Sequence, residues 1–101
     1  MAGIMPYRLV YSRTSRDLIR NIHPDLKPII RLRIKALEEN PYSGKRLEKE
    51  LSGYFSLRAK RFRILYKIQE KDQTIAIHYV GHRKDVYQLF KEYMLGETQP
   101  G

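Results

Sequence analysis

The chain of 101 residues contains no cysteine and no tryptophan, and acidic residues are scarce in it. The absence of cysteine excludes disulfide frameworks, thiolate nucleophiles and cysteine-bound zinc. No segment approaches the roughly 20 apolar residues that are needed to span a bilayer, and the first residues lack the apolar core of a signal peptide. We therefore expect a cytoplasmic protein with no membrane partner.

Positive charge is abundant. Lysine and arginine number 20 against 11 aspartate and glutamate residues, which gives a formal net charge of +9. Such a surface binds nucleic acid, anionic lipid or an acidic protein more readily than a neutral metabolite. The aliphatic content is ordinary and no low-complexity run interrupts it, so residues 1–101 are expected to form a single domain, with residues 1–5 and 96–101 frayed.

Two helices are expected to follow a first strand at residues 7–11. Thr14 and Asp17 have the spacing of a capping box, which predicts the start of the first helix. Asp25 is predicted to cap the second helix, because Pro28 is tolerated in a first turn. An apolar residue recurs every three or four positions in both segments, so two antiparallel helices joined by a short turn are expected.

The second half of the chain is dominated by strands. A polar connection at 41–53 is followed by predicted strands at 54–59, 62–69 and 74–81, and residues 84–95 have helical apolar spacing. The order strand, two helices, three strands, helix predicts an α+β fold. In it, two N-terminal helices pack on one face of a mostly antiparallel four-stranded sheet, and a short helix ends the chain.

Strand periodicity separates the side chains of this sheet into two sets, because alternate residues point to opposite faces. The set expected to face the helices is Phe55, Leu57, Phe62, Ile64, Tyr66, Ile68, Ile75, Ile77 and Tyr79. The set expected on an open face is Ser56, Arg58, Lys60, Arg63, Lys67, His78 and His82. Residues 54–69 include five cations and no acid. This one-sided charge favours binding of a polyanion over the alternative, a sheet face that is merely solvated.

Single-stranded RNA suits a basic sheet with nearby tyrosines better than duplex DNA does, since no helix has the features of a recognition helix. Cleavage of RNA by its own 2′-hydroxyl requires a base, an acid and fixed cations. His82 could act as base or acid. Surrounding cations would favour the ionised form of Tyr87. Arg63 and Arg83 would hold phosphate. Taken singly, the histidine could be structural and the tyrosine a packing residue, so the hypothesis depends on their convergence.

Three segments together resemble the RelE branch of the RelE/ParE toxin superfamily. They are residues 51–58 (L-S-G-Y-F-S-L-R), 63–68 (R-I-L-Y-K-I) and 80–87 (V-G-H-R-K-D-V-Y). The resemblance extends over nearly the whole chain and implies a RelE-like fold. It also implies a toxin of a type II toxin–antitoxin system that inhibits translation. Such a toxin is a ribosome-dependent endoribonuclease that cuts mRNA in the A site by 2′-hydroxyl attack, with neither metal nor small-molecule cofactor. Its products are a 2′,3′-cyclic phosphate and a 5′-hydroxyl.

The same resemblance implies roles for particular residues. Arg63 matches an arginine that contacts the scissile phosphate, Arg83 one that stabilises charge, and Tyr87 a tyrosine of proton transfer or base stacking. Arg58 lies near strand lysines of the family, and Ser56 stands where the best-known member has a second lysine. His82 occupies a position often held by lysine or histidine. Further RNA contacts are expected from Lys60, Arg61, Lys67, Lys45, Arg46 and Lys49.

The general base and the biological target stay open at this point. Glu48 and Glu50 are candidates for the base, but the simpler interpretation is that both are surface partners of the neighbouring cations. In that case the base could be a lysine, a tyrosine or His82. Two other functions compete with RNA cleavage. One is ParE-like inhibition of DNA gyrase, and the other is RNA binding without catalysis.

Two partners are expected from the resemblance. One is mRNA on the ribosome, with contacts to 16S rRNA, and the other is a cognate RelB-like antitoxin. The antitoxin would cover the basic face or displace the last helix, whose apolar stripe is Val86, Leu89, Phe90, Tyr93 and Met94. Simple core packing is the alternative role for that stripe.

Overall fold

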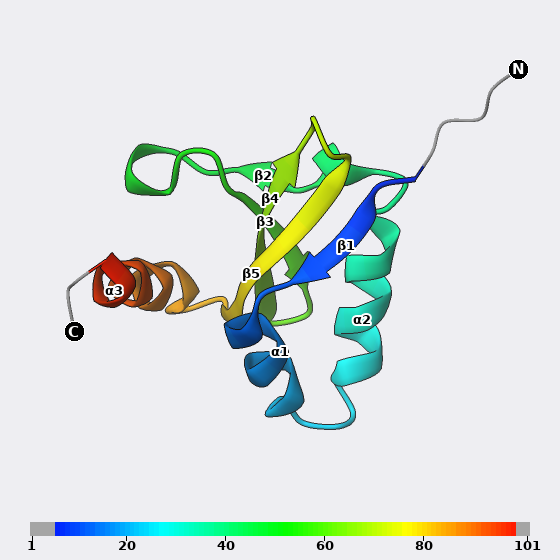
Figure 1. The fold of residues 1–101 in the computed structure, drawn as a ribbon. Coiled ribbons are helices and arrows are strands. Elements are labelled where there is room, and N and C mark those ends of the chain that lie inside the picture. The colour runs from blue at the N-terminus through cyan, green and yellow to red at the C-terminus, as the bar shows by residue number, and fades with distance from the viewer. Residues whose placement is uncertain (1–5, 99–101) are drawn as a thin grey trace, which may run out of the picture.

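A five-stranded sheet with helices on both faces forms the body of the protein, as the computed structural model of residues 6–98 shows (Figure 1). The strands are β1 (Arg8–Tyr11), β2 (Lys45–Arg46), β3 (Phe55–Ala59), β4 (Phe62–Gln69) and β5 (Thr74–His82). Their order across the sheet is β1-β5-β4-β3-β2, with β1 parallel to β5 and every other pair antiparallel. The predicted α+β class is confirmed, and the two-residue β2 adds a strand to the four expected.

Three helices accompany the sheet: α1 (Arg13–Arg20), α2 (Lys27–Ala36) and α3 (Val86–Thr98). Short 3₁₀ turns at Pro41–Ser43 and Lys49–Leu51 flank β2 in the predicted polar connection. Within residues 6–98, no helix is long and apolar enough to cross a bilayer. Because α3 continues to Thr98, residues 96–98 are helical, contrary to the expected frayed tail. The remainder of that tail and residues 1–5 lie outside the described residues.

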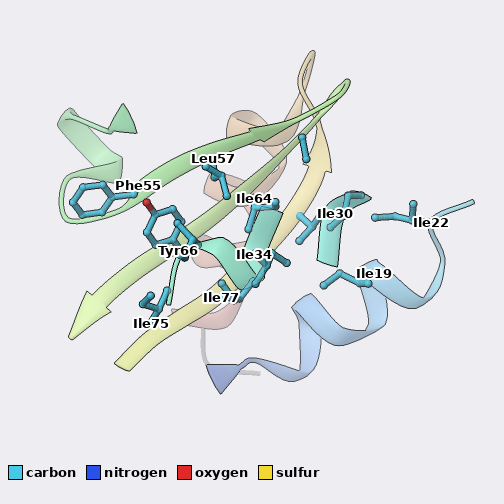
Figure 2. Packing of buried hydrophobic residues seen from close by; sticks show 13 residues of the cluster. Ile19, Ile22, Ile30, Ile34, Phe55, Leu57, Ile64, Tyr66, Ile75 and Ile77 are labelled. Atoms are coloured by element: carbon cyan, nitrogen blue, oxygen red, sulfur yellow. The ribbon is translucent and has the colours of Figure 1, made fainter. Parts of the chain in front are cut away.

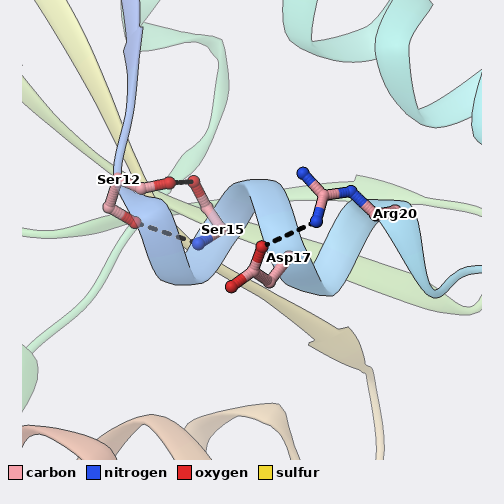
Figure 3. A network of polar contacts seen from close by, with 4 residues as sticks. All are labelled: Ser12, Ser15, Asp17 and Arg20. Atoms are coloured by element: carbon pink, nitrogen blue, oxygen red, sulfur yellow. Dashed lines mark hydrogen bonds and ion pairs between the residues drawn. The ribbon is translucent and has the colours of Figure 1, made fainter.

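The first helix begins earlier than its sequence predicts. Ser12 is the N-cap, since its side-chain oxygen accepts a hydrogen bond of 3.0 Å from the backbone N–H of Ser15. The Ser15 hydroxyl returns a bond of 2.9 Å to the Ser12 carbonyl. Asp17 pairs instead with Arg20 at 3.3 Å (Figure 3). The predicted capping box at Thr14 was therefore wrong, because the helix starts two residues earlier at Ser12 and the Thr14 hydroxyl donates instead to the hydroxyl of Tyr93 at 2.9 Å.

The second helix has no side-chain cap. Its N-cap position is Leu26, and Pro28 lies in the first turn as predicted. The predicted cap at Asp25 was wrong, because the helix begins one residue later and no side chain caps it; the N–H of Asp25 donates a bond of 3.1 Å to Nδ1 of His23. The two helices run antiparallel on one side of the sheet, as expected (Figure 1).

The main core lies between this helix pair and the sheet (Figure 2). Ile30 and Ile34 of α2 are buried against Ile64 and Ile77 of the central strands. Eight of the nine residues predicted to face the helices do belong to this core or pack against it: Phe55, Leu57, Phe62, Ile64, Tyr66, Ile68, Ile75 and Ile77. The predicted faces of the side chains along β3 and β4 are therefore confirmed.

A β-bulge shifts the alternation in the second half of β5. Tyr66 pairs with Ile77 but Leu65 pairs with Tyr79, so His78 is an extra residue in the ladder. Tyr79 consequently turns away from the main core, and its ring lies 5.3 Å from that of Phe90 in α3. The prediction for Tyr79 was wrong because a bulge of one residue reverses the face of every side chain beyond it.

A second, smaller core fills the space under α3. Its buried members are Leu51, Leu65, Val86 and Phe90. Gly81 makes the approach of α3 possible, because a Cβ atom there would lie 2.9 Å from Cγ2 of Val86. The sheet face expected to be open is thus partly covered. In the α3 stripe, Val86 and Phe90 are buried in this core and Tyr93 and Met94 pack against it, whereas Leu89 is 40% exposed.

Candidate RNA-binding and catalytic site

A buried serine connects three elements of the predicted site. Ser56 on β3 is 2% exposed, and its hydroxyl oxygen accepts hydrogen bonds from two groups. Nη1 of Arg63 on β4 donates to it at 3.2 Å, and the hydroxyl of Tyr87 on α3 donates to it at 3.1 Å. The arginine and the tyrosine are thereby fixed on either side of one atom.

A second guanidinium lies beside the first. Arg58 pairs directly with Arg63 across the antiparallel β3 and β4 strands, so the two side chains emerge on the same face. Nε of Arg58 donates to the carbonyl of Lys60 at 3.3 Å. Arg33 of α2 donates to the carbonyl of Arg58 at 3.0 Å, which anchors that strand from the other side of the sheet. Two adjacent guanidiniums with donors to spare can hold a phosphate group.

Further cations collect at the tip of the β3–β4 hairpin. Lys60 and Arg61 form its two-residue turn, and Lys60 has a φ of 57°. The backbone N–H of Arg83 donates to the carbonyl of Arg61 at 2.8 Å, so the turn that follows β5 lies against this hairpin. Arg83 is exposed. The backbone of Arg83 therefore lies at the same end of the sheet as the Arg58–Arg63 pair.

His82 is not part of this cluster. It pairs with Phe62, whose side chain packs against the main core, and the two rings lie 5.9 Å apart. Its Nδ1 accepts a bond of 3.4 Å from the N–H of Lys84. The expectation that His82 shares the face of Arg63 was therefore wrong, since the bulge in β5 places the residue on the opposite face.

The other predicted RNA contacts are divided between the two faces. Lys45 pairs with Ser56 and lies on the face of Arg63, and Nζ of Lys67 lies 4.9 Å from the centre of the Tyr54 ring. Arg46 lies over Phe55 at 5.3 Å and so belongs to the side of α2. Lys49 is exposed in a 3₁₀ turn with a φ of 56°.

The two carboxylates considered as a general base, Glu48 and Glu50, lie outside the arginine cluster. Glu50 pairs with Lys91 of α3 at 3.7 Å, and Glu48 is exposed. Glu50 was predicted to pair at the surface with a cation close to it in the sequence. It does form a surface ion pair, but with Lys91 of α3. Within the described part of the chain, no three His, Asp or Glu side chains are grouped so as to hold a metal ion.

Sequence reasoning placed Ser56 on the correct face but missed its burial and its two hydrogen bonds. Only the position of α3, which depends on Gly81 and the bulge, brings Tyr87 to the serine. It also missed a second group of cations on α1 and α2. Their spacing of four residues within each helix was the available signal.

The fold and the site define a small, basic α+β protein with a group of arginines and lysines at one end of its sheet. Residues 15–87 match the family model for the ParE toxin of the type II toxin–antitoxin system parDE. Over 85 residues the chain is 34% identical to Toxin RelG of Mycobacterium tuberculosis, an alignment that covers 82% of this chain and 98% of that protein. The chain belongs to the RelE/ParE superfamily of toxins from type II toxin–antitoxin systems.

Solved structures of this superfamily share the fold. The toxin–antitoxin complex RelBE2 of Mycobacterium tuberculosis includes a chain that matches with a TM-score of 0.70 at 31% identity, over 77% of this chain and 99% of that one. The archaeal RelE–RelB complex of Pyrococcus horikoshii matches with a TM-score of 0.67 at 20% identity, over 78% and 97% of the two chains. At 20% identity, this second similarity supports the fold of the chain and nothing about its function.

Proposed function

We propose that this toxin is a ribosome-dependent endoribonuclease that cuts mRNA in the A site and so inhibits translation. The observation that carries the proposal is the fixed arrangement of Arg63 and Tyr87 on the buried hydroxyl of Ser56, with Arg58 opposite Arg63. It combines two phosphate-binding guanidiniums with a proton-bearing phenol on one face.

The proposed reaction is an internal transfer within the RNA. The 2′-oxygen attacks the adjacent phosphorus, the bond from phosphorus to the 5′-oxygen breaks, and a 2′,3′-cyclic phosphate forms. Arg63 and Arg58 stabilise the negative charge that accumulates on the phosphoryl oxygens, and the exposed Arg83 adds to this field. Tyr87 gives its proton to the leaving 5′-oxygen. The 2′-hydroxyl proton passes to a base, and Lys45, which lies opposite Ser56, could accept it only as the neutral amine, because the ammonium form has no lone pair.

Inhibition of DNA gyrase is the second candidate function. The match to a ParE family model favours it, as does the position of His82 away from the arginines. A gyrase inhibitor would use the basic sheet end for binding only. The hydrogen bonds of Tyr87 and Arg63 to Ser56 would then serve to hold α3 on the sheet.

We further propose a RelB-like antitoxin as the partner that controls the toxin, because related chains were solved as RelB–RelE complexes. An acidic segment suits a protein with a net charge of +9. The apolar positions Leu89 and Leu95 on α3, 40% and 63% exposed, offer contacts for its nonpolar side chains. If such a partner displaced α3, Tyr87 would leave Ser56 and the arginines.

Parallel assays with programmed ribosomes and with DNA gyrase test the proposal. We expect mRNA to be cut in the A site, the activity to be lost in Arg63→Ala, and gyrase to be unaffected. Lys71→Ala, which removes a cation in the β4–β5 turn, is the matched control and should cut at the normal rate. Intact mRNA together with stalled gyrase cleavage complexes would establish the second candidate instead.

A further inference from the structure

A pocket rich in aromatic rings lies between the start of α1 and the second half of α3. Both helices follow the end of the sheet at which β1 and β5 finish (Figure 1). The volume of the pocket is about 570 Å³, which is typical of sites for small molecules. Its lining includes four rings, a thioether and a guanidinium, those of Tyr54, His78, Phe90, Tyr93, Met94 and Arg13.

The bulge in β5 supplies one wall of this pocket. It turns two successive rings toward the side of α3, because the ring of His78 lies 5.3 Å from that of Tyr54 and the ring of Tyr79 lies 5.3 Å from that of Phe90. The Ser12 hydroxyl donates a bond of 3.2 Å to the carbonyl of His78. The start of α1 is thereby fixed beside the bulge.

Helix α3 supplies the opposite wall. Phe90 is 1% exposed and its ring meets that of Tyr54 edge to face at 5.1 Å. The Thr14 hydroxyl donates to the hydroxyl of Tyr93 at 2.9 Å, which ties α1 to α3. The side chains of Tyr54, His78 and Tyr93 are only partly buried, so they leave ring surface for a ligand.

The pocket adjoins the Ser56 site on two elements. Tyr54 is two residues before Ser56, which puts it on the same side of the extended chain about 7 Å away. Phe90 is three residues after Tyr87 on α3, about 4.5 Å further along the helix axis. A nucleotide held at Ser56 would therefore have its neighbour at the mouth of the pocket.

We propose that this pocket receives one unstacked base of the message, from a nucleotide next to the scissile phosphate, and so sets the base preference of the toxin. The inference rests on the proposed function, since the Ser56 site is what would hold that phosphate. Unstacked bases bind to the faces of aromatic side chains. The imidazole of His78 adds nitrogen atoms that can exchange hydrogen bonds with the edge of a base.

Charge around the pocket favours a nucleotide over an apolar side chain of a protein partner. Arg13 is exposed and lines the pocket, and Nζ of Lys67 lies 4.9 Å from the centre of the Tyr54 ring. Within residues 6–98, neither cation forms an ion pair with a carboxylate. The phosphates on either side of a bound base would meet these cations, whereas an aliphatic side chain would gain nothing from them.

Binding of an RNA trinucleotide that cannot be cut tests the pocket directly. The probe has a 2′-deoxy sugar at the attacking nucleotide and 2-aminopurine, a fluorescent base that dims when stacked, on one side of it or the other. We expect native toxin to quench one of the two probes. Tyr54→Leu should abolish the quenching and bind that probe at least about fivefold more weakly. His78→Leu, a second change in the lining, should act in the same direction.

Tyr79→Leu is the matched control, because this ring also packs on Phe90 but does not line the pocket. It should quench as native toxin does. On programmed ribosomes, messages with each of the four bases beside the cut should give native toxin a range of kcat/KM values. Tyr54→Leu should narrow that range at least about fivefold, and Tyr79→Leu should keep it. Arg13→Gln should weaken every message equally, as expected for a phosphate contact.

Quenching and base preference that Tyr54→Leu leaves at native levels would overturn the inference. So would a pocket that binds the neutral apolar dye Nile red, and loses it in Tyr54→Leu, while native toxin quenches neither probe; that outcome would assign the pocket to an apolar side chain of a protein partner. Probe quenching together with messages that stay intact on ribosomes would keep the base pocket and refute cleavage, so the two proposals fail separately.

Discussion

Among single residues, Ser56 is the one whose hydroxyl group holds the proposed site together. It accepts hydrogen bonds from a strand arginine and from a helix tyrosine, and it does so while 2% exposed. A short, buried acceptor of this kind leaves Arg63 and Tyr87 little freedom. Ser56 is a positioning residue, because it acts through its two partners.

Ser56→Ala should lower the rate of mRNA cleavage more than it lowers affinity for ribosomes. Loss of the acceptor frees both partners, and two lost hydrogen bonds cost about 1 to 3 kcal/mol of unfolding free energy. Single-turnover cleavage, ribosome binding and urea unfolding measure the three quantities. Ser52→Ala, at an exposed position, is the control and should change none of them. Native cleavage by Ser56→Ala would refute the positioning role.

His82→Ala should keep mRNA cleavage within about twofold of the native rate, because the imidazole lies with Phe62 on the other face. The dependence of the single-turnover rate on pH should also be unchanged between pH 5 and 8. A large loss of rate, or a changed pH profile in that range, would return His82 to the catalytic group.

Sequence periodicity was sufficient to place Arg58, Arg63 and Ser56 on one face, because β3 and β4 alternate without interruption. It was insufficient for Tyr79 and His82, which follow the bulge at His78. A bulge depends on how two strands fit together, so the pattern of a single strand contains no sign of it.

At the scale of elements, the site is completed by the docking of α3. Val86 at the start of that helix is fully buried against Gly81 of β5. The closeness of this contact sets where Tyr87, the next residue, meets the sheet. The apolar stripe of α3 could be predicted from the sequence. The sheet face that this stripe covers could not, because Leu51 and Leu65 become buried only when α3 packs on them.

Gly81→Ala should destabilise the fold and reduce cleavage, because the new Cβ would lie 2.9 Å from Cγ2 of Val86. Overpacking of this kind costs about 1 to 3 kcal/mol. Gly96→Ala in α3 is the control, since its Cβ would meet nothing within 4 Å, and it should stabilise that helix by up to about 1 kcal/mol. Chemical denaturation checks both. Equal effects of the two substitutions would contradict the close approach of α3.

A carboxylate joins three segments at the other end of the sheet. Oε1 of Glu70 accepts hydrogen bonds from Tyr42 at 2.5 Å and from Tyr7 at 2.8 Å. The bond from Tyr42 is the main cause that lowers the pKa of Glu70. The same bond raises the pKa of Tyr42 to about 12. The cluster ties the segment before β1 and the 3₁₀ turn at Pro41–Ser43 to the β4–β5 hairpin.

The stability that this cluster supplies should depend on pH at both extremes. A lowered pKa means that the Glu70 contribution is present above its ordinary value of 4.5 and is lost as the pH falls. A raised pKa means that the Tyr42 contribution is present below 10.0 and is lost as the pH rises toward 12. We expect Glu70→Gln to be less stable than the native protein near neutral pH and the difference to shrink in acid. Glu39→Gln, at an exposed position, should show no such trend.

At the scale of the whole molecule, the net charge of +9 is distributed over both sides of the sheet. Arginines around Ser56 occupy the side of α3, and the other side holds four cations of α1 and α2, which are Arg16, Arg20, Lys27 and Arg31. Composition alone predicted a polyanionic partner. The arrangement on two sides could not be predicted, because it depends on which helix faces remain uncovered after the main core has formed.

The most direct measurement of the central claim is the single-turnover cleavage rate of mRNA on programmed ribosomes, with native toxin and with Tyr87→Phe. We predict cleavage in the A site that leaves a 2′,3′-cyclic phosphate, and a fall of about 100-fold or more when the phenol proton is removed. Tyr42→Phe, which removes a phenol hydroxyl bonded to Glu70, should cut at the native rate. Equal rates for native toxin and Tyr87→Phe would contradict the assignment of Tyr87 as the acid.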